Sequence, residues 1–489
     1  MTNESTIAFA SNRGPITFVE DGGGFQTKRG AGGLASALDA VARRLGDTAV
    51  WVAAATSDAD RHAIERRAIE AVHEELGYRF YLLDIDPKTY ARYYDNISNR
   101  MLWFANHCLW DEVEVEGFDR ASEDWEEAYE PVNERFATAL ADALGPNPLV
   151  LFQDYHLSTA PAYLRDRRDD ATILHFTHTS FCRPEGGLGR LPGRIADRVI
   201  KGMSAADLIG LHVSRWCRNF ADSCAEAGAT IDRSTGSMSH DGMTSWIRSY
   251  PIPIDAGDLI ERASSDGARK WAREFREWAG GGRLLARVDR SEPSKNIVRG
   301  FEAFGALLDR RPELADEIRF VACVYPSRQT MPEYRRYSEQ IQSAVDRVLE
   351  RHPGSIKLYS DDDFDRSLGA LLAYDALLVN PLMDGMNLVS KEGPTLNQQD
   401  GVLILSSGAG SFEELGDAAV EITDPLDVGQ TSMAIEKALE MPAPERKERA
   451  QELREAATAR TPEDWIEAQL ADLRSISDTG EPVSPAPAL

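Results

Sequence analysis

The stretch ALLVNPLMDGMNLVSKE, residues 376–392, places in succession three features that decide the fold class. Four apolar residues, Ala376–Val379, come first, and a polar loop and a helix start follow them. A short apolar run without alternation is typical of a strand that is buried on both faces of a parallel sheet. The succession therefore predicts one strand–loop–helix unit of an α/β protein.

Similar apolar runs recur along the whole chain, separated by amphipathic stretches. In the first half they lie at residues 7–10, 49–54, 149–152, 172–177 and 208–213, and in the second half at 284–288, 318–324, 356–359, 376–379 and 402–405. Apolar strands interleaved with helices indicate parallel sheets covered on both faces. We therefore predict a doubly wound α/β architecture in both halves.

A proline-containing segment, Ser249–Asp255, predicts the junction between the halves. Its two prolines fix an extended backbone, and the alternation of strands and helices restarts after it. The predicted domains are residues 1–248 and 249–475. The last residues, 476–489, are rich in Pro and Ser, and we expect them to be disordered.

Composition limits the partners of this chain. Of 489 residues, 42% are hydrophobic and 27% are charged, which is typical of a globular protein with two cores. The formal net charge is −26, so the surface repels phosphate backbones, and we expect no nucleic-acid partner. A phosphate site must then be built locally, from a few Arg, Lys and backbone N–H groups.

The cysteines and the apolar segments bear on the compartment. The five cysteines are scattered and include no C-x-x-C pair, which favours a reducing compartment over a disulfide framework or a structural zinc site. The first residues lack a basic segment followed by an apolar run, so no signal peptide is predicted. No apolar stretch approaches the ~20 residues that span a bilayer. We therefore expect a cytoplasmic protein without membrane contact, and leave homo-oligomerisation open.

Two motifs precede the first predicted helix. Ser11-Asn12-Arg13-Gly14 ends a strand, and Gly30-Ala31-Gly32-Gly33-Leu34 opens a helix. That helix is predicted from one apolar face and a glycine stop, formed by Leu34, Leu38, Val41, Ala42, Leu45 and Gly46. A glycine-rich loop lets backbone amides approach an anion, but it equally serves tight packing of helix on sheet.

Polar residues also follow two later strands of the first half. Asp154-Tyr155-His156 comes after the run 149–152, and His178 comes directly after the run 172–177. Open α/β sheets bind ligands at these carboxyl ends, although a capped turn is the alternative interpretation. His175 lies inside its strand and is expected to be a satisfied core residue. Because no third ligand accompanies the two His, we predict no metal site.

In the second half, Arg290 and Lys295 share one loop after a predicted strand, and Arg328 follows the next strand. An Arg fork and a Lys point charge suit a diphosphate, although an exposed basic loop is the plainer alternative. The loop from Asp384 to Glu392 enters a helix, where free backbone amides accept anions. Asp384 or Asn387 as an ordinary helix cap is the alternative there.

All these motifs occupy carboxyl ends of predicted parallel strands, in both halves. That is the arrangement expected of a ligand cleft between two doubly wound domains.

Taken in order, these residues resemble the trehalose-6-phosphate synthase family of retaining glycosyltransferases. The matching segments are SNRG, GAGGL, Tyr94…Asn99…Leu102-Trp103, QDYHL, HTSF, Arg290…Lys295, PSR at Arg328, and DGMNLVSKE. The resemblance covers nearly the whole chain. It implies the GT-B fold, with two Rossmann-like domains facing a central cleft and a last helix, from about residue 461, that crosses back to the first domain.

The resemblance also implies roles for individual residues. Those of the acceptor site would be Arg13, Tyr94, Trp103, Asp154 and Arg328, with the two arginines on the acceptor phosphate. Those of the nucleotide-sugar site would be Gly33, His178, Arg290, Lys295, Asp384, Gly385, Met386, Asn387, Leu388 and Glu392, with Glu392 on the ribose. The catalytic set would be Asp154, His178, Arg290, Lys295 and Asp384. No metal and no cofactor is implied.

Three departures mark a divergent branch. Gln153 stands where the family has His, Ser180 replaces a Pro, and the Arg290–Asn296 loop departs from R-L-D-Y-x-K-G. In that loop, in the segment 215–220 and in the turn Glu392-Gly393-Pro394, the chain is similar to validoxylamine A 7′-phosphate synthase, a pseudo-glycosyltransferase. The SNRG and GAGGL segments are more like those of the ordinary synthases.

Three functions follow as hypotheses. The first is transfer of glucose from a nucleotide sugar to glucose 6-phosphate, giving trehalose 6-phosphate. The second is coupling of a cyclitol or sugar nucleotide to another phosphorylated acceptor, and the third is a catalytically silent sugar-phosphate sensor.

Overall fold

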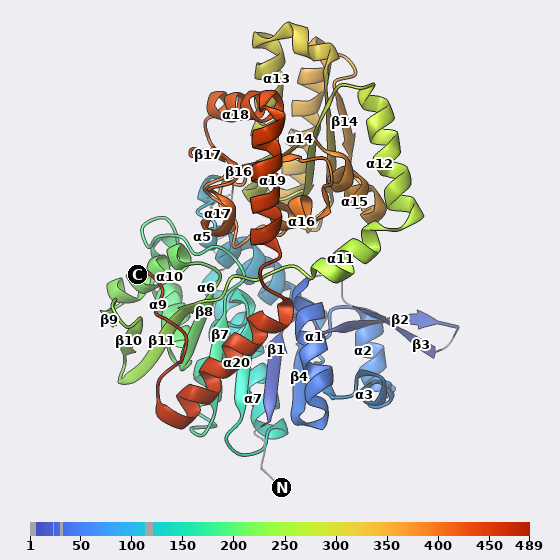
Figure 1. The fold of residues 1–489 in the computed structure, drawn as a ribbon. Helices are drawn as coiled ribbons and strands as arrows, with labels where there is room; N and C mark the ends of the chain where they lie inside the picture. The colour runs from blue at the N-terminus through green and yellow to red at the C-terminus, as the bar shows by residue number, and fades with distance from the viewer. Residues whose placement is uncertain (1–5, 23, 30–32, 113–120) are drawn as a thin grey trace. The chain divides into compact units, whose positions relative to one another are not determined.

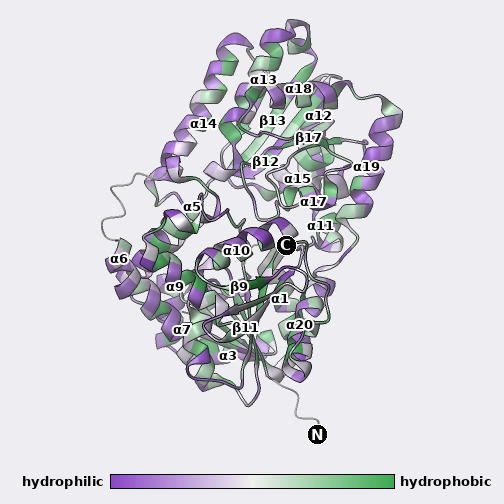
Figure 2. Ribbon diagram, turned by 90° about the vertical axis from the view of Figure 1, so that its left-hand side faces the viewer, coloured by the Kyte–Doolittle hydropathy of each residue, from purple (hydrophilic) through white to green (hydrophobic). Residues whose placement is uncertain are grey.

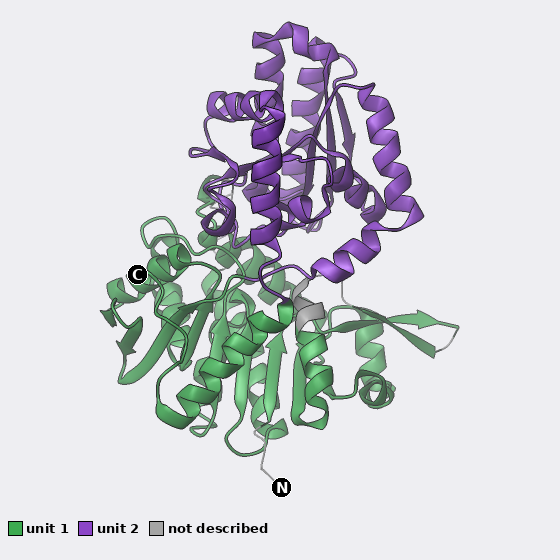
Figure 3. Ribbon diagram, viewed as in Figure 1, with its two compact units in different colours: residues 1–251, 462–489 green, residues 252–461 purple. Residues whose placement is uncertain are grey.

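The computed structural model describes residues 6–22, 24–29, 33–112 and 121–489 (Figure 1). The chain divides into two compact units (Figure 3). Unit 1 comprises residues 1–251 and 462–489, and unit 2 comprises residues 252–461. The division falls inside the proline-containing segment Ser249–Asp255. The last residues of the chain thus belong to the same unit as the first.

Unit 1 is built on a nine-stranded sheet with the order β5-β4-β1-β6-β7-β8-β11-β10-β9. The parallel part consists of β1 (Ile7–Ser11), β4 (Ala49–Ala54), β5 (Arg79–Leu83), β6 (Leu149–Gln153), β7 (Thr172–Phe176), β8 (Leu208–Leu211) and β11 (Met243–Ser249). The strands β10 (Ser237–His240) and β9 (Thr230–Asp232) extend one edge in antiparallel pairing. A separate hairpin pairs β2 (Ile16–Asp21) with β3 (Gly24–Arg29).

Helices surround this sheet. Their bounds are α1 (Gly33–Leu45), α2 (Asp58–Glu65), α3 (Ile69–Leu76), α4 (Pro87–Ala91), α5 (Trp103–Asn106), α6 (Ala121–Asp124), α7 (Glu130–Ala143), α8 (Ala160–Arg165), α9 (Gly193–Ser204), α10 (Ser214–Glu226) and α20 (Pro462–Thr479). A wider π-helical segment, Arg92–Leu102, joins α4 to α5. As its periodicity predicts, α1 buries Leu38, Val41 and Ala42 and ends at Gly46. α20 lies beside α1 and across β7 (Figure 1).

Unit 2 contains a six-stranded, wholly parallel sheet with the order β14-β13-β12-β15-β16-β17. Its strands are β12 (Arg283–Arg290), β13 (Ile318–Tyr325), β14 (Ile356–Tyr359), β15 (Ala376–Val379), β16 (Val402–Ser406) and β17 (Val420–Ile422). Its helices are α11 (Ala256–Ala263), α12 (Asp266–Ala279), α13 (Ile297–Arg310), α14 (Pro332–Arg351), α15 (Phe364–Ala373), α16 (Val389–Leu396), α17 (Phe412–Leu415), α18 (Val428–Glu440) and α19 (Ala443–Ala457).

Both faces of this second sheet are covered. Leu285 belongs to the core formed with α13, α14 and α18, while its neighbours Leu284 and Ala286 belong to the core formed with α12 and α15. Successive strand residues point to opposite faces, so the strand is buried on both. In Figure 2 the helices around this sheet carry both hydrophilic and hydrophobic residues, as helices with one face on a core do. The prediction of a doubly wound sheet is confirmed.

The expectation of a disordered tail is wrong. α20 runs to Thr479, and the backbone N–H groups of Val483 and Ser484 each donate to Asp472 Oδ1 at 2.8 Å. Arg248 Nε donates to the Ser484 carbonyl at 3.1 Å. The buried carboxylate of Asp472 and the Arg248 side chain hold these last residues, and composition does not reveal such partners.

Two further sequence expectations can be compared with the structure. The scattered cysteines argued against disulfides, and for one pair this expectation is wrong, because Cys108 and Cys182 form a disulfide with Cα atoms 5.9 Å apart. In the part of the chain that the structure describes, no helix is long and apolar enough to cross a membrane.

Candidate active site

In unit 2, Lys295 and Asp384 meet where two neighbouring strands end. Lys295 closes a short 3-10 turn, Pro293–Lys295, directly after β12, and Asp384 follows β15. The Lys295 Nζ atom donates to Asp384 Oδ2, and both side chains are largely buried, with 11% and 14% exposed. β12 and β15 are adjacent and parallel, so their carboxyl ends bring the two loops together.

Arg290, the last residue of β12, is paired with Glu292. Its Nη1 atom lies 3.3 Å from Glu292 Oε1, and the Arg290 side chain remains 49% exposed. Ser327 Oγ donates to the same carboxylate at 3.0 Å. Burial alone would raise the pKa of Glu292, but the cationic groups of Arg290, Arg328 and Lys295 outweigh it and lower that pKa to about 2. Glu292 is therefore an anion at neutral pH, set among cations.

The loop from Asp384 to Leu388 is held by the turn Gly408–Ser411. Asp384 N donates to the Gly408 carbonyl at 3.1 Å, and Gly410 N donates to the Asp384 carbonyl at 3.0 Å. A Cβ at Gly410 would come within 2.0 Å of the Gly385 carbonyl oxygen, so this close approach requires glycine. The loop that precedes α16 is thereby fixed in place.

Polar groups line the start of α16. Asn387, with φ at +70°, donates to Asp384 Oδ2 at 3.1 Å and accepts from Ser390 N at 3.1 Å, which is the capping bond of the alternative interpretation. Among the described residues no acceptor faces the backbone N–H groups of Met386, Asn387 or Leu388. Such amides at a helix start attract anions. One turn into the helix, burial raises the pKa of Glu392 to about 7.

Arg328 lies with the residues around Arg290. Its guanidinium donates to the hydroxyl of Tyr334 and stacks 5.5 Å from the centre of that ring. The backbone of Arg328 has a φ of +44°, which is uncommon outside glycine. Its charge lowers the pKa of Glu292. Three cationic side chains, those of Arg290, Arg328 and Lys295, therefore lie around the carboxylates of Glu292 and Asp384.

In unit 1, Asp154 and His178 lie together at the ends of β6 and β7. The His178 backbone N–H donates to Asp154 Oδ1 at 3.1 Å, and Asp154 has a φ of +74°. His178 Nε2–H donates to Gln153 Oε1 at 2.9 Å. Burial, and then the nearby imidazoles of His212, His175 and His156, lower the pKa of His178 well below its usual value, so the ring is neutral.

His175 differs from expectation. It is fully buried in β7, but neither ring nitrogen has a partner among the described residues, so it is not the satisfied core residue that its position in a strand suggested. Burial lowers its pKa to about 4, which keeps the ring uncharged. The hydrophobic run around it gave no sign of an unpaired ring.

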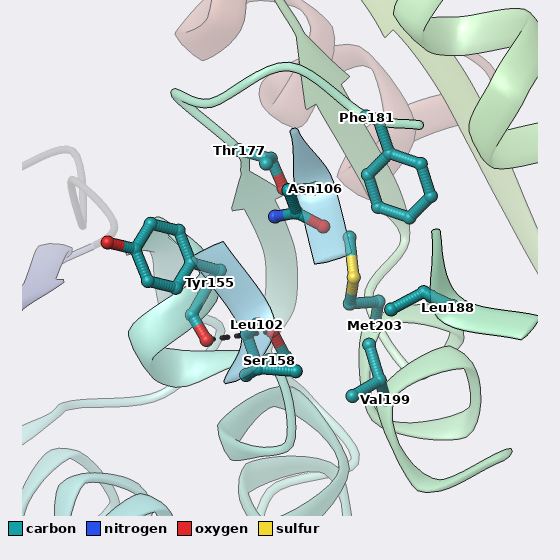
Figure 4. A pocket seen from close by; sticks show the side chains of 9 residues that line it. All are labelled: Leu102, Asn106, Tyr155, Ser158, Thr177, Phe181, Leu188, Val199 and Met203. Carbon is teal, nitrogen blue, oxygen red and sulfur yellow. Dashed lines mark hydrogen bonds between the residues drawn. The ribbon is translucent and has the colours of Figure 1, made fainter. Parts of the chain in front are cut away.

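Arg13 and the aromatic residues form a second group in unit 1. Arg13 Nη2 donates to the Tyr94 hydroxyl at 3.4 Å, and Tyr94 stacks on His156 with ring centres 5.5 Å apart. Trp103 is 3% exposed and stacks on His107, so its ring is mainly a packing element. A cavity of about 10 Å³ near this group is lined by Leu102, Asn106, Tyr155 and Thr177, among others (Figure 4). It has the volume of about one water and is no sugar site.

Sequence reasoning missed some neighbours of the predicted residues. α20 brings Trp465 to 6.1 Å from His178 between ring centres, and Trp465 Nε1 donates to the Tyr250 carbonyl at 3.0 Å. Gln153 departs from the family pattern, but the sequence did not reveal its hydrogen bond to His178. Of the glycine-rich segment, Gly33 begins α1, whereas residues 30–32 lie outside the described residues. Within the described ranges, no three His, Cys, Asp or Glu side chains form a group suited to a metal ion.

Comparison with known proteins identifies the family. The model of glycosyltransferase family 20 matches residues 5–475 of this chain. The chain belongs to glycosyltransferase family 20. It is therefore a glycosyltransferase, and its two parallel-sheet units have the GT-B architecture of the trehalose-6-phosphate synthases.

Three relatives illustrate how far the similarity extends. Validamine 7-phosphate valienyltransferase of Streptomyces hygroscopicus subsp. jinggangensis is 30% identical over 502 residues, covering 99% of this chain and 98% of that protein. Trehalose-6-phosphate synthase of Mycolicibacterium smegmatis is 30% identical over 498 residues, covering 98% and 95%. The crystal structure of a UDP-forming α,α-trehalose-phosphate synthase from Burkholderia vietnamiensis superposes with a TM-score of 0.82 at 27% identity, covering 97% and 99%.

Proposed function

We propose that this family 20 glycosyltransferase transfers glucose from a nucleotide sugar to glucose 6-phosphate, giving trehalose 6-phosphate with retained anomeric configuration. The observation that carries the proposal is the cluster around Lys295 and Asp384 in unit 2, at the carboxyl ends of β12 and β15. The synthases of M. smegmatis and B. vietnamiensis, named for this product, support it.

The proposed donor site would bind the diphosphate of the nucleotide sugar. As the glycosidic bond breaks, negative charge accumulates on the leaving diphosphate. Arg290, Lys295 and the amides of residues 386–388 are hydrogen-bond donors that need little reorganisation to stabilise that charge. The positive charges of Arg290 and Lys295 favour an anionic ligand in this part of unit 2.

The donor sugar and ribose would take the remaining acidic groups. Asp384, next to the diphosphate donors, would accept hydrogen bonds from sugar hydroxyls. Glu392, whose half-buried carboxyl has a raised pKa, would accept hydrogen bonds from the ribose hydroxyls. The Lys295–Asp384 pair would then loosen as the diphosphate replaces the carboxylate as the partner of Lys295.

In unit 1 the proposed acceptor groups are the exposed Arg13 for the phosphate and Asp154 for hydroxyls. His178 would contact the donor sugar as a neutral ring, and Tyr94 would form a wall. Positioning of the acceptor hydroxyl would supply much of the rate enhancement. No covalent nucleophile, metal or cofactor is part of this proposal.

A second function is supported by one observation. The Streptomyces valienyltransferase is as similar to this chain as the M. smegmatis synthase is, at 30% identity and comparable coverage. Transfer of a valienyl or related cyclitol group onto a phosphorylated amino-cyclitol is therefore the alternative. A silent sugar-phosphate sensor is disfavoured, because such a protein would not need the diphosphate donors Arg290 and Lys295.

The test is a product assay. The protein is incubated with UDP-, GDP- or ADP-glucose and glucose 6-phosphate, with and without EDTA, and products are detected by mass spectrometry. A phosphorylated disaccharide that is absent with Lys295→Ala supports the proposal. If the protein binds a nucleotide but none of the three pairs gives this product, the cyclitol alternative is favoured. Tight binding of glucose 6-phosphate with no nucleotide binding would indicate a sensor.

A further inference from the structure

A guanidinium that belongs to none of the predicted motifs lies beneath Lys295. Arg287 is in the middle of β12 and has no exposed surface. Its Nη2 atom donates to the Lys295 carbonyl at 2.8 Å and to Asn380 Oδ1 at 2.6 Å. Its Nε atom donates to Asp289 Oδ2 at 2.8 Å. One buried side chain thus connects β12, the turn that carries Lys295 and the loop after β15.

The space for this guanidinium depends on a glycine in α13. A Cβ at Gly300 would come within 2.3 Å of Arg287 Nη1, and the next nearest atoms, from Leu378 and Asn380, are 3.3 and 3.4 Å away. Arg287 Nη1 is buried without a partner among the described residues. The guanidinium is therefore confined from the helix side and anchored on the side of the turn.

Other hydrogen bonds also hold the turn and its neighbour Asn296. The Ser294 carbonyl accepts from Leu382 N at 2.8 Å, and Asn296, whose φ is +57°, donates to the carbonyls of Asn380 and Pro425 at 3.1 and 2.6 Å. At Lys295 itself, the backbone N–H donates to the Glu292 carbonyl at 3.0 Å, and Arg287 supplies the hydrogen bond to the carbonyl. These contacts join the loop after β12 to the loop after β15, which carries Asp384.

Stability alone does not explain a buried ion pair in a sheet core. Removing two charges from water costs several kcal/mol each, and replacing such a pair by apolar residues of similar volume is often neutral or stabilising. On its own face of β12, Arg287 lies between Leu285, a buried residue of the core formed with α13, and its ion-pair partner Asp289. Aliphatic side chains at both 287 and 289 would suit that core. The hydrogen bond to the Lys295 carbonyl is what an aliphatic residue would lack.

We propose that Arg287 is a positioning residue that fixes the Pro293–Lys295 turn and so directs the Lys295 ammonium group at the diphosphate of the donor. This inference rests on the proposed donor site. Arg287 does not touch the substrate, and its effect passes through the Lys295 backbone. Its loss would weaken binding of the diphosphate portion and leave binding of the nucleoside portion unchanged.

Two variants perturb this contact by different routes. Arg287→Lys keeps a charge but reaches fewer acceptors. Gly300→Ala does not change the residue at position 287, but its new methyl group displaces the end of the Arg287 guanidinium. Gly305→Ala is the matched control, because it lies in the same helix and its Cβ would meet Val348 and Arg351, at 2.9 and 3.0 Å, instead of Arg287.

The experiment is calorimetric titration of the full-length protein with UDP, GDP and ADP, followed by the tightest of these and its nucleoside on each variant. Thermal unfolding confirms that the variants are folded. We expect a loss of about tenfold or more in affinity for the diphosphate with Arg287→Lys and Gly300→Ala, no loss for the nucleoside, and wild-type values for Gly305→Ala.

The possible outcomes separate the two proposals. If the wild type binds none of the three diphosphates, the proposed donor site fails. If it binds one, and Gly300→Ala or a folded Arg287→Lys binds it as tightly, the positioning role is wrong. Equal losses for the diphosphate and the nucleoside would show a general structural role and would also overturn it. Should Arg287→Lys fail to fold, Gly300→Ala decides the matter.

Discussion

The ammonium group of Lys295 donates to the carboxylate of Asp384, across two loops that follow neighbouring strands. This pair joins the group proposed to bind the leaving diphosphate to the group proposed to bind the donor sugar. In the unliganded protein each side chain satisfies the other, which reduces the cost of keeping both charges largely buried. Donor binding must exchange this bond for bonds to the ligand, so the two residues should respond differently to substitution.

Loss of a diphosphate donor should lower turnover. Lys295→Ala and Arg290→Ala are each expected to reduce kcat by ~10²–10³-fold, because a preorganised donor contributes roughly 3–4 kcal/mol to transition-state stabilisation. Steady-state kinetics at saturating donor measures this. Lys270→Ala, at a side chain 69% exposed on α12, is the control and should behave as wild type. Full turnover by either active-site variant would refute the assignment.

Asp384→Asn should separate binding from catalysis. The amide no longer neutralises Lys295, so the nucleoside diphosphate should bind several-fold more tightly. Turnover should fall about a hundredfold, because the charged acceptor for the sugar hydroxyls is lost. Calorimetry with the diphosphate and kinetics with the complete donor give the two numbers. A parallel decrease in both would mean that Asp384 supports the loop and does not compete for Lys295.

A carboxylate at position 153 should raise the pKa of His178. In Gln153→Glu the new carboxylate would lie at hydrogen-bond distance from His178 Nε2 and raise the pKa of that ring from its depressed value. An imidazolium beside a sugar that gains positive charge would slow transfer, by about tenfold at pH 7, with recovery as the pH rises and the ring loses its proton. The pH profile of kcat and the NMR titration of His178 measure this.

Gln153→Met is the companion variant. It removes the hydrogen bond without adding a charge, so it should change kcat less and leave the pH profile flat. An unchanged His178 titration in Gln153→Glu would contradict the proposed influence of residue 153.

The C-terminal segment should stabilise unit 1. Asp472 is fully buried and accepts from the Tyr250 hydroxyl at 2.5 Å as well as from Val483 N and Ser484 N. Deleting residues 480–489 leaves this carboxylate short of partners, which should cost about 2 kcal/mol and lower the thermal midpoint by roughly 4 °C or more. Asp478→Asn, at an exposed position of the same helix, should leave the midpoint unchanged. A truncated protein with wild-type stability would show that this contact contributes nothing.

Hydrophobicity predicts the strands of this fold where their residues are continuously apolar, and fails where they are partly exposed. Strands such as β6 and β15 are continuous apolar runs, and their detection follows from burial on both faces. β5 has one buried residue, Phe80, and was missed, as were the short antiparallel strands β9 and β10 at the edge of the sheet. Their residues are partly exposed, so hydrophobicity alone does not separate them from loops.

The residues of the candidate site also fall into those that the sequence predicts and those that it does not. Residues at carboxyl ends of strands, such as Lys295 and Asp384, were predictable because parallel topology places them at one edge. Arg287 and Asp472 were not, since each is a buried charge inside an element that reads as ordinary strand or helix. Their roles depend on partners far away in the chain, at Asn380 and at Tyr250, and no local pattern encodes such partners.

Glu392 should make nucleoside binding depend on pH. Because burial raises its pKa to about 7, the carboxyl of the free protein is largely protonated below pH 7 and ionised above it. Ribose hydroxyls donate to the ionised form, so nucleoside affinity should be highest well above pH 7 and fall as the pH drops through 7. Glu392→Gln should bind more weakly at high pH and show no such dependence. The nucleoside is the right probe, because phosphate groups themselves titrate near pH ~6. A wild-type affinity that stays constant between pH 6 and 8.5, measured by calorimetry, would remove Glu392 from the ribose site.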